Sequence, residues 1–138
     1  FIDVIVEKFK YNNKVHVFGK GLLDMEIDRY IYLNDNSSSS NVVSDTSELA
    51  KFVSYNDTVG SQFGWVDLLK VNTEGDEYQL LESIIDKGNH KKIKNILVQF
   101  HDFMDGAVQK KAAIETELAK THKQVFNYEF VWTLWTIK

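Results

Sequence analysis

The sequence contains no cysteine, and this absence excludes two kinds of site. Without thiols the chain forms neither a disulfide framework nor a thiolate metal site, so the redox compartment cannot be read from it. Histidines are present, but His16, His90 and His122 show no ligand spacing with one another. We therefore predict no metal centre.

Long apolar runs and a basic face are also missing. No run approaches the roughly 20 residues of a membrane-spanning helix, and the first residues have neither the charged region nor the cleavage site of a signal peptide. The 16 basic and 20 acidic residues are interspersed and give a net charge of −4, which offers no face for a phosphate backbone. We expect a soluble protein without nucleic-acid or membrane partners, and the cytoplasm is the default location.

The length of 138 residues, 43% of them hydrophobic, suits one compact domain and is too short for two. The sequence has no internal repeat and no linker, so we predict a single domain over residues 1–138. The chain begins at Phe1 rather than Met, in a stretch with the pattern of a helix interior. We therefore expect further sequence upstream and a domain that is incomplete at its N-terminal side.

The first half of the chain has mixed patterns. Apolar side chains at helical spacing predict an amphipathic helix over residues 2–9 that covers a sheet face, and residues 15–18 predict a strand. Alternation over residues 27–33 predicts a half-exposed strand. The polar residues 34–47 predict a loop, which ends in a capping pattern ahead of a short turn over residues 49–52.

The second half is more regular. Residues 66–72 form a nearly continuous apolar run, which is typical of a strand buried on both faces by helices. Helical spacing over residues 76–87 is followed by a second apolar run over residues 93–100, and this order predicts a parallel βαβ unit. Further elements are a helix over residues 105–121 and two closing strands over residues 125–130 and 131–138.

Ligands of open parallel sheets gather at the carboxyl ends of the strands, because loops and helix N-termini converge there. Three segments occupy such places: residues 19–24, residues 72–77 and His101 with Asp102. Asn72 and Glu74 lie at the strand exit itself, which favours a functional role for them. Asp76 and Glu77 open a helix, so they serve either a site or ordinary capping.

His101 ends an apolar strand and precedes Asp102. A neutral imidazole oriented by a carboxylate is suited to general-base catalysis near neutral pH. A hydrogen-bonded structural pair is the alternative interpretation. The sequence has no Gly-x-Ser-x-Gly elbow, phosphate loop or Cys-His pair that would indicate another chemistry.

Residues 68–82, LLKVNTEGDEYQLLE, resemble the signature of the FkbM-type methyltransferases, a strand reading LLK-apolar-D-x-EG-x-E that is followed by a helix. The segments at 15–22, 37–40 and 96–101 are similar to successive segments of that family. The resemblance implies a Rossmann-like class I methyltransferase fold, with a mostly parallel sheet and a C-terminal antiparallel hairpin. It also implies S-adenosylmethionine as donor and methylation of a hydroxyl, often on a sugar or a natural product.

Carried onto this chain, the resemblance gives Gly21, Leu22 and Asn72 as cofactor-binding residues and His101, Asn72 and Glu74 as catalytic residues. Gly21 and Leu22 would flank the adenine, and the acceptor would be a small molecule or a glycan. The family has an aspartate where this chain has Asn72. A catalytically inactive, methyltransferase-like interaction or structural module is therefore the alternative function.

In the family, two further strands with a glycine-rich loop precede the part that corresponds to Phe1. Their absence would leave a gap of about 14 Å in the sheet, which cannot stay open. We expect the chain to pair the two edges directly, to borrow strands from a second copy as a homodimer, or to depend on an upstream segment. We also expect the isolated chain to bind S-adenosylmethionine weakly or not at all and to transfer no methyl group.

Overall fold

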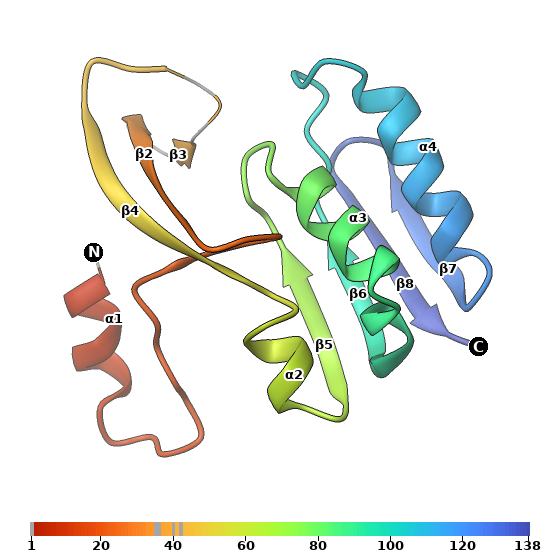
Figure 1. Cartoon of the computed structure of the whole chain (residues 1–138), viewed down its shortest axis with the longest axis horizontal. Coiled ribbons are helices and arrows are strands. Elements are labelled where there is room, and N and C mark those ends of the chain that lie inside the picture. Colours follow the sequence, from red (N-terminus) through yellow and green to blue (C-terminus); the bar gives the residue numbers. More distant parts are fainter. Residues whose placement is uncertain (1, 35–36, 40, 42) are drawn as a thin grey trace.

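The computed structural model describes residues 2–34, 37–39, 41 and 43–138, and it arranges them around two four-stranded sheets (Figure 1). The first sheet has the strand order β1-β4-β2-β3 and the second has the order β5-β6-β8-β7. In chain order the elements are α1 (Ile2–Phe9), β1 (Gly21–Leu23), β2 (Ile27–Asn34), β3 (Ser37–Ser39), β4 (Ser47–Ser54), α2 (Val59–Gln62), β5 (Val66–Val71), α3 (Glu77–Asp86), η1 (Asn89–Lys92), β6 (Ile93–Val98), α4 (Ala107–Leu118), β7 (His122–Tyr128) and β8 (Trp132–Ile137).

The first sheet is built around β4. β1 pairs with β4 in parallel, whereas β2 pairs antiparallel with both β4 and β3. Phe52 of β4 stands opposite Gly21 on one side and Ile27 on the other. A Cβ atom at position 21 would lie 2.3 Å from the Phe52 ring, so this close approach of β1 to β4 requires glycine.

The second sheet contains the parallel pair β5 and β6, which α3 connects. β8 pairs antiparallel with β6, and β7 pairs antiparallel with β8 through a short turn. The register of β7 and β8 shifts between Gln124 and Phe126, which is the mark of a β-bulge. Within the described residues β5 is an edge strand.

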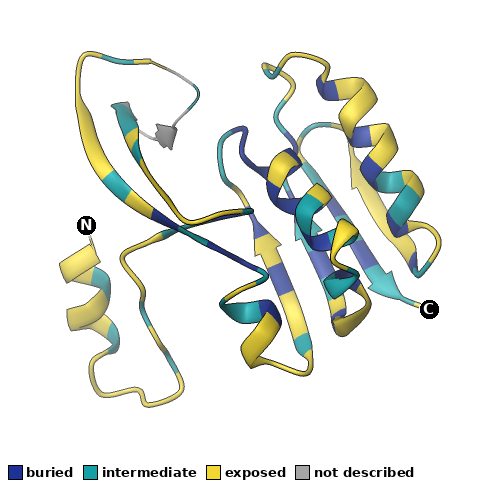
Figure 2. Ribbon diagram, viewed as in Figure 1, coloured by how far each residue is buried: buried dark blue, intermediate teal, exposed yellow. Residues whose placement is uncertain are grey.

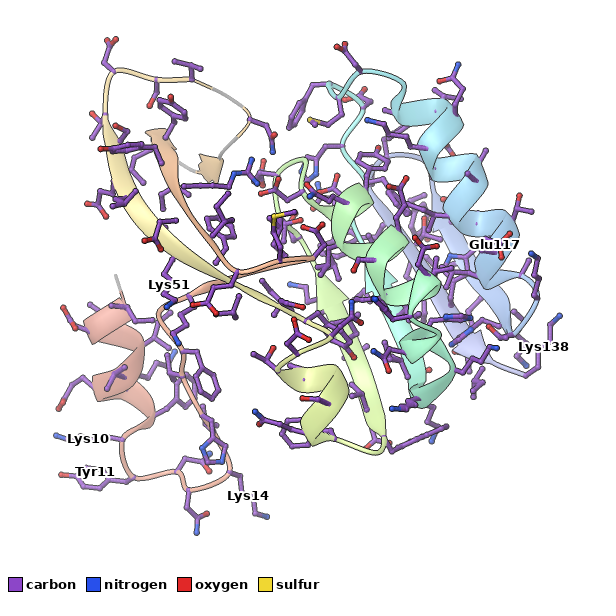
Figure 3. The ribbon with its side chains drawn as sticks, viewed as in Figure 1. Lys10, Tyr11, Lys14, Lys51, Glu117 and Lys138 are labelled. Carbon is purple, nitrogen blue, oxygen red and sulfur yellow. The ribbon has the colours of Figure 1, made fainter. Side chains whose placement is uncertain are left out.

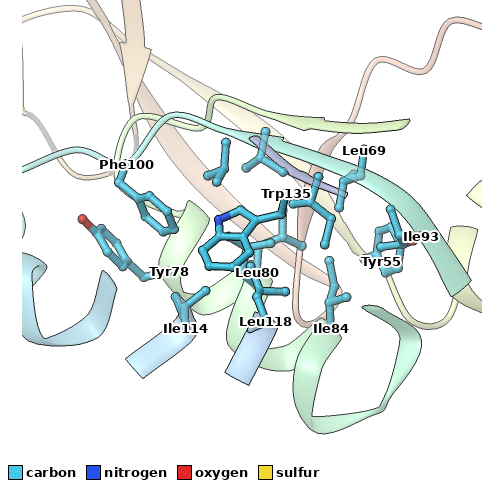
Figure 4. Packing of buried hydrophobic residues seen from close by; sticks show 14 of the residues in the cluster. Tyr55, Leu69, Tyr78, Leu80, Ile84, Ile93, Phe100, Ile114, Leu118 and Trp135 are labelled. Carbon is cyan, nitrogen blue, oxygen red and sulfur yellow. The ribbon is translucent and has the colours of Figure 1, made fainter. Parts of the chain in front are cut away.

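The hydrophobic core lies between the second sheet and the helices α3 and α4 (Figure 4). Alternate residues of each strand point to this face, because side chains alternate across a strand. The fully buried members include Leu80, Leu81, Ile84, Ile93, Ile96, Val98, Ile114 and Leu118. Burial is therefore concentrated in the second half of the chain, and the described side chains of the first sheet are mostly half-buried or exposed (Figure 2).

The predicted fold class, a mostly parallel Rossmann-like sheet, is wrong. The chain has two mixed sheets, because β1 to β4 pair with one another instead of extending the sheet of β5 and β6. The alternating pattern of β2 suits a half-exposed strand, but it does not specify a partner. Antiparallel pairing between β2 and β4 joins residues that are 25 positions apart at Ile27 with Phe52 and 15 apart at Tyr32 with Ser47, and no local pattern encodes it.

Three local predictions in the first half are also wrong. Residues 15–18 form no strand; pairing begins at Gly21, and Leu23 takes the buried position while Phe18 stays 75% exposed. The predicted turn over residues 49–52 belongs to β4, whose ladder with β2 overrides the capping pattern. The predicted loop over residues 34–47 contains β3 and the start of β4. Positions 35–36, 40 and 42 of that loop lie outside the described residues, as does the last serine of the tract at 37–40.

Two predictions about burial fail for a shared reason. β5 is covered on one face only, with Leu69 and Val71 buried and Leu68 53% exposed. α1 forms as predicted, yet none of its residues is buried, and Tyr11 just beyond it is 91% exposed (Figure 3). An apolar pattern shows which side of an element can be buried, but it does not supply the surface that covers it.

The predicted βαβ unit is confirmed: β5 and β6 are adjacent parallel strands joined by α3. The predicted strand over residues 27–33, the helix over residues 105–121 and the closing antiparallel hairpin correspond to β2, α4 and the pair β7 and β8. Among the residues placed by the structure, no helix combines the length and apolar character needed to cross a membrane.

Candidate functional site

Residues 72–76, which join β5 to α3, contain the predicted site residues Asn72 and Glu74. Glu74 has a φ of 52° and Gly75 a φ of 111°, in the left-handed region that favours glycine. A Cβ atom at position 75 would lie 2.7 Å from Sδ of Met104 and 2.9 Å from Nδ2 of Asn41. Glycine at position 75 is therefore required by both the backbone conformation and the lack of space.

The buried carboxylate of Glu77 connects this loop to the loop after β6. Glu77 is 0% exposed to solvent. Oε2 accepts a hydrogen bond from the backbone N of Gly75 at 2.9 Å and another from Oγ1 of Thr73 at 3.2 Å. Oε1 accepts a hydrogen bond from the backbone N of His101 at 2.8 Å and lies 3.0 Å from its Nδ1. One side chain thus fixes two strand exits relative to each other.

The imidazole of His101 lies between two carboxylates. Its Nε2 is 3.5 Å from Oε2 of Glu74, on the opposite side of the ring from Glu77. The Phe103 ring lies 5.3 Å from the His101 ring between centroids, and Phe103 is 48% exposed. The side chain of His101 is 11% exposed, so the ring is confined but can still be reached from solvent.

The Tyr78 side chain of α3 contacts the loop after β6, which carries His101. Its hydroxyl donates a hydrogen bond to the backbone O of His101 at 2.8 Å, and its ring packs 5.4 Å from that of Phe100. Burial, followed by the negative charges of Glu77 and Asp102, raises the pKa of the Tyr78 hydroxyl. Tyr78 therefore remains a hydrogen-bond donor at all physiological pH values.

Two side chains from the first half of the chain also contact the loop after β5. Nη1 of Arg29 in β2 lies 3.2 Å from Oδ1 of Asp76. Nδ2 of Asn41 donates to the backbone O of Glu74 at 3.3 Å and to Oδ1 of Asp76 at 3.2 Å. The side chain of Asp76 is only 8% exposed. The conformation of the candidate site thus depends on contacts between both halves of the chain.

A cavity of about 540 Å³ lies between the first sheet and the carboxyl end of β5. Its lining mixes apolar side chains with charges of both signs. The lining residues are Ile2, Phe18, Gly19, Lys20, Gly21, Leu22, Ile31, Glu48, Leu49, Ala50, Lys51, Phe52, Asn72, Thr73 and Asp76.

The predicted site residues fall into two groups. Gly21, Leu22 and Asn72, the predicted cofactor-binding residues, all line this cavity although they come from distant parts of the chain. Glu74 and His101, the other predicted catalytic residues, lie next to each other at the exits of β5 and β6 and are not part of the cavity lining. The Asn72 loop joins the two groups, because Thr73 both lines the cavity and donates to Glu77.

The sequence interpretation left the role of Glu77 open between capping and function, and it did not identify Arg29 or Asn41. A signal for Glu77 was present: it lies on the apolar stripe of α3 with Leu80, Leu81 and Ile84, where a carboxylate must find partners. Arg29 and Asn41 gave no such signal, because their contacts with the loop span more than 30 residues of sequence.

Within the described ranges, no group of three or more His, Asp or Glu side chains is arranged to hold a metal ion. No protein-family model, no curated protein and no solved structure matched the chain. The geometry of the cavity and of the Glu77–His101 network is therefore the basis for a functional proposal.

Proposed function

We propose that this chain carries part of the site of an S-adenosylmethionine-dependent O-methyltransferase of the FkbM type, which acts on a hydroxyl of a sugar or small natural product. The main support is the convergence of Gly21, Leu22 and Asn72 on one cavity of about 540 Å³. This volume is in the range of about 300 to 1,000 Å³ that is usual for small-molecule sites. The resemblance of residues 68–82 to the family signature is the second support.

The lining of the cavity fits the chemical groups of S-adenosylmethionine. The donor has an adenine ring, ribose hydroxyls and a methionine part with a carboxylate. Apolar side chains would contact the adenine, carboxylates would accept hydrogen bonds from the ribose, and lysines would attract the methionine carboxylate. The apolar side chains are Leu22, Ile31, Leu49 and Phe52. The carboxylates are Glu48 and Asp76, and the lysines are Lys20 and Lys51.

When bound, S-adenosylmethionine supplies a methyl group on a positively charged sulfur. The residues of the chain align the acceptor hydroxyl and remove its proton. Asn72 lies at the cavity, where its amide orients the acceptor relative to the donor. His101 lies outside the cavity lining, at the neighbouring strand exit, and a hydroxyl that extends from the cavity past Asn72 to this ring would give its proton to Nε2. The negative charge of Glu74, 3.5 Å from Nε2, stabilises the imidazolium that forms.

Titration of the ¹⁵N-labelled chain with S-adenosylhomocysteine, followed by NMR, tests the proposal even if binding is weak. We expect amide shifts at Gly21, Leu22 and Asn72, and smaller shifts at the same concentration in Asn72→Ala. Asn13→Ala is the matched control, because Asn13 is exposed and does not line the cavity. A folded chain that shows no shifts would mean that Gly21, Leu22 and Asn72 do not form a donor site on their own, and would favour the inactive, methyltransferase-like interaction or structural module.

A further inference from the structure

We propose that Glu77 is a positioning residue, which holds the His101 ring as the tautomer with its proton on Nδ1. The lone pair of Nε2 is then available to take the proton of the methyl-accepting hydroxyl. The inference rests on the proposed function for the use of His101 as a base, but the tautomer itself is a property of the chain alone. Glu77 has no ligand-binding role in the proposal above and does not line the cavity.

The hydrogen-bond partners of Glu77 determine the charge state of its carboxyl group. Its carboxylate receives three clear donors: the backbone N–H groups of Gly75 and His101 and the hydroxyl of Thr73. Oε2 accepts hydrogen bonds from both Gly75 and Thr73, so a hydrogen on the carboxyl group would lie on Oε1 and point to Nδ1 of His101. Imidazole is a stronger base than a carboxylate, so this hydrogen resides on Nδ1. The carboxyl is therefore ionised and acts only as an acceptor.

The protonation of Nδ1 follows from the short distance to the ring. Oε1 of Glu77 lies 3.0 Å from Nδ1 of His101, within hydrogen-bond range. Two acceptors do not form a hydrogen bond, so Nδ1 must carry a proton. In the neutral imidazole only one nitrogen is protonated, and Nε2 is then unprotonated. A carboxylate that orients a catalytic histidine in this way fixes its tautomer and its direction.

Glu77 is the neighbour that determines the tautomer of the His101 ring. Among the residues that the structure describes, the charged or titratable groups around His101 are Glu77 from α3, Glu74 from the preceding loop, Asp102 beside it in the chain, and Tyr78, which bonds to its backbone. Among these, Glu77 is the group within hydrogen-bond range of Nδ1. Glu74 faces Nε2, so its removal should not release the proton on Nδ1.

Glu77 also connects the ring to the rest of the site. The second oxygen of Glu77 holds Thr73 and Gly75, which follow Asn72 in the chain. The carboxylate therefore sets the orientation of His101 and the conformation of the loop that carries Asn72 and Glu74. A change at Glu77 should disturb proton transfer and alignment of the acceptor together.

The experiment records the ring ¹⁵N shifts of His101 in the ¹⁵N-histidine-labelled chain at about pH 9, where imidazoles are neutral. We expect a protonated Nδ1 and an unprotonated Nε2 in the wild type. In Glu77→Gln we expect at least half of this population to convert to the other tautomer, because the amide offers a donor as well as an acceptor. Glu77→Asp, which restores a carboxylate, should recover part of it.

Glu74→Gln is the matched control, since it removes a carboxylate from the other side of the same ring and should leave Nδ1 protonated. A wild-type spectrum with the proton on Nε2 would overturn the inference, and so would an unchanged tautomer in Glu77→Gln. The wild-type measurement decides the question even if Glu77→Gln does not fold. Neither spectrum requires a methyl donor, so failure of S-adenosylhomocysteine binding would reject the proposed function and leave this result unaffected.

Discussion

The two halves of the molecule differ in how they are stabilised. Residues 2–54, with α1 and the first sheet, bury only Leu23, Phe52 and Ser54 among the residues described there. Residues 55–138 contain the entire hydrophobic cluster that packs α3 and α4 onto the second sheet. Because buried apolar area is the main source of folding free energy, the second half should dominate the stability of the chain. The first half contributes mainly residues that line the cavity and the contacts of Arg29 and Asn41 with the loop after β5.

The largest effect is expected from the same substitution made in each half. Leu81→Ala removes a side chain with an exposed fraction of 0% in α3, and should lower the free energy of unfolding by about 2 to 5 kcal/mol. Leu49→Ala removes a side chain of β4 that is 62% exposed, and should lower it by less than about 0.5 kcal/mol. Urea denaturation measures both values. Similar losses in the two variants would contradict the difference between the halves.

The same difference explains which parts of the fold could be predicted. In α3, Leu80, Leu81 and Ile84 face one core, so local spacing was sufficient to define the helix. In β4, Leu49 and Lys51 are exposed and Phe52 is the buried member of residues 49–52, and a capping pattern suggested a turn there. The strand forms because it pairs with β2, and this pairing brings together residues distant in sequence. In these two elements, the local pattern was sufficient where burial is strong and failed where strand pairing decides the structure.

The candidate site shows the same limit. Gly21, Leu22 and Asn72 were predicted from a resemblance, and they line one cavity. Glu77 was left between two interpretations, because a carboxylate at a helix start is ordinarily favoured by the helix dipole. Its contact with His101, 24 residues further along the chain, could not be read from either residue. The sequence indicated the positions at the strand exits but not the network that connects them.

A medium effect is expected at the contact between the halves. Arg29→Met and Asp76→Asn, made singly and together, should show a coupling energy of about 1 kcal/mol in urea denaturation, because Asp76 is largely buried. The exposed pair Lys51–Glu26 lies within the first half and should show no measurable coupling. A coupling near zero for Arg29 and Asp76 would mean that this ion pair does not tie the first sheet to the candidate site.

The smallest effect is expected in the pH dependence of stability. The test compares His90, which is buried in the second half, with His16, which is exposed in the first half. Burial lowers the pKa of His90, and the charges of His122 and Lys91 act in the same direction. In the structure's described part, Nδ1 of His90 has no hydrogen-bond partner. The folded chain therefore binds this proton less readily than the unfolded chain.

The sign of the effect follows from this difference. The stability that neutral His90 provides is fully present above the unfolded pKa of about 6.5, and it is lost as the pH falls from that value toward the lower folded pKa. We expect His90→Leu to lose less stability than the wild type between about pH 8 and pH 5. His16→Leu, at an exposed position in the first half, should follow the wild type. Urea denaturation over this pH range compares the three proteins, and equal slopes for His90→Leu and the wild type would show that burial of His90 does not oppose its protonation.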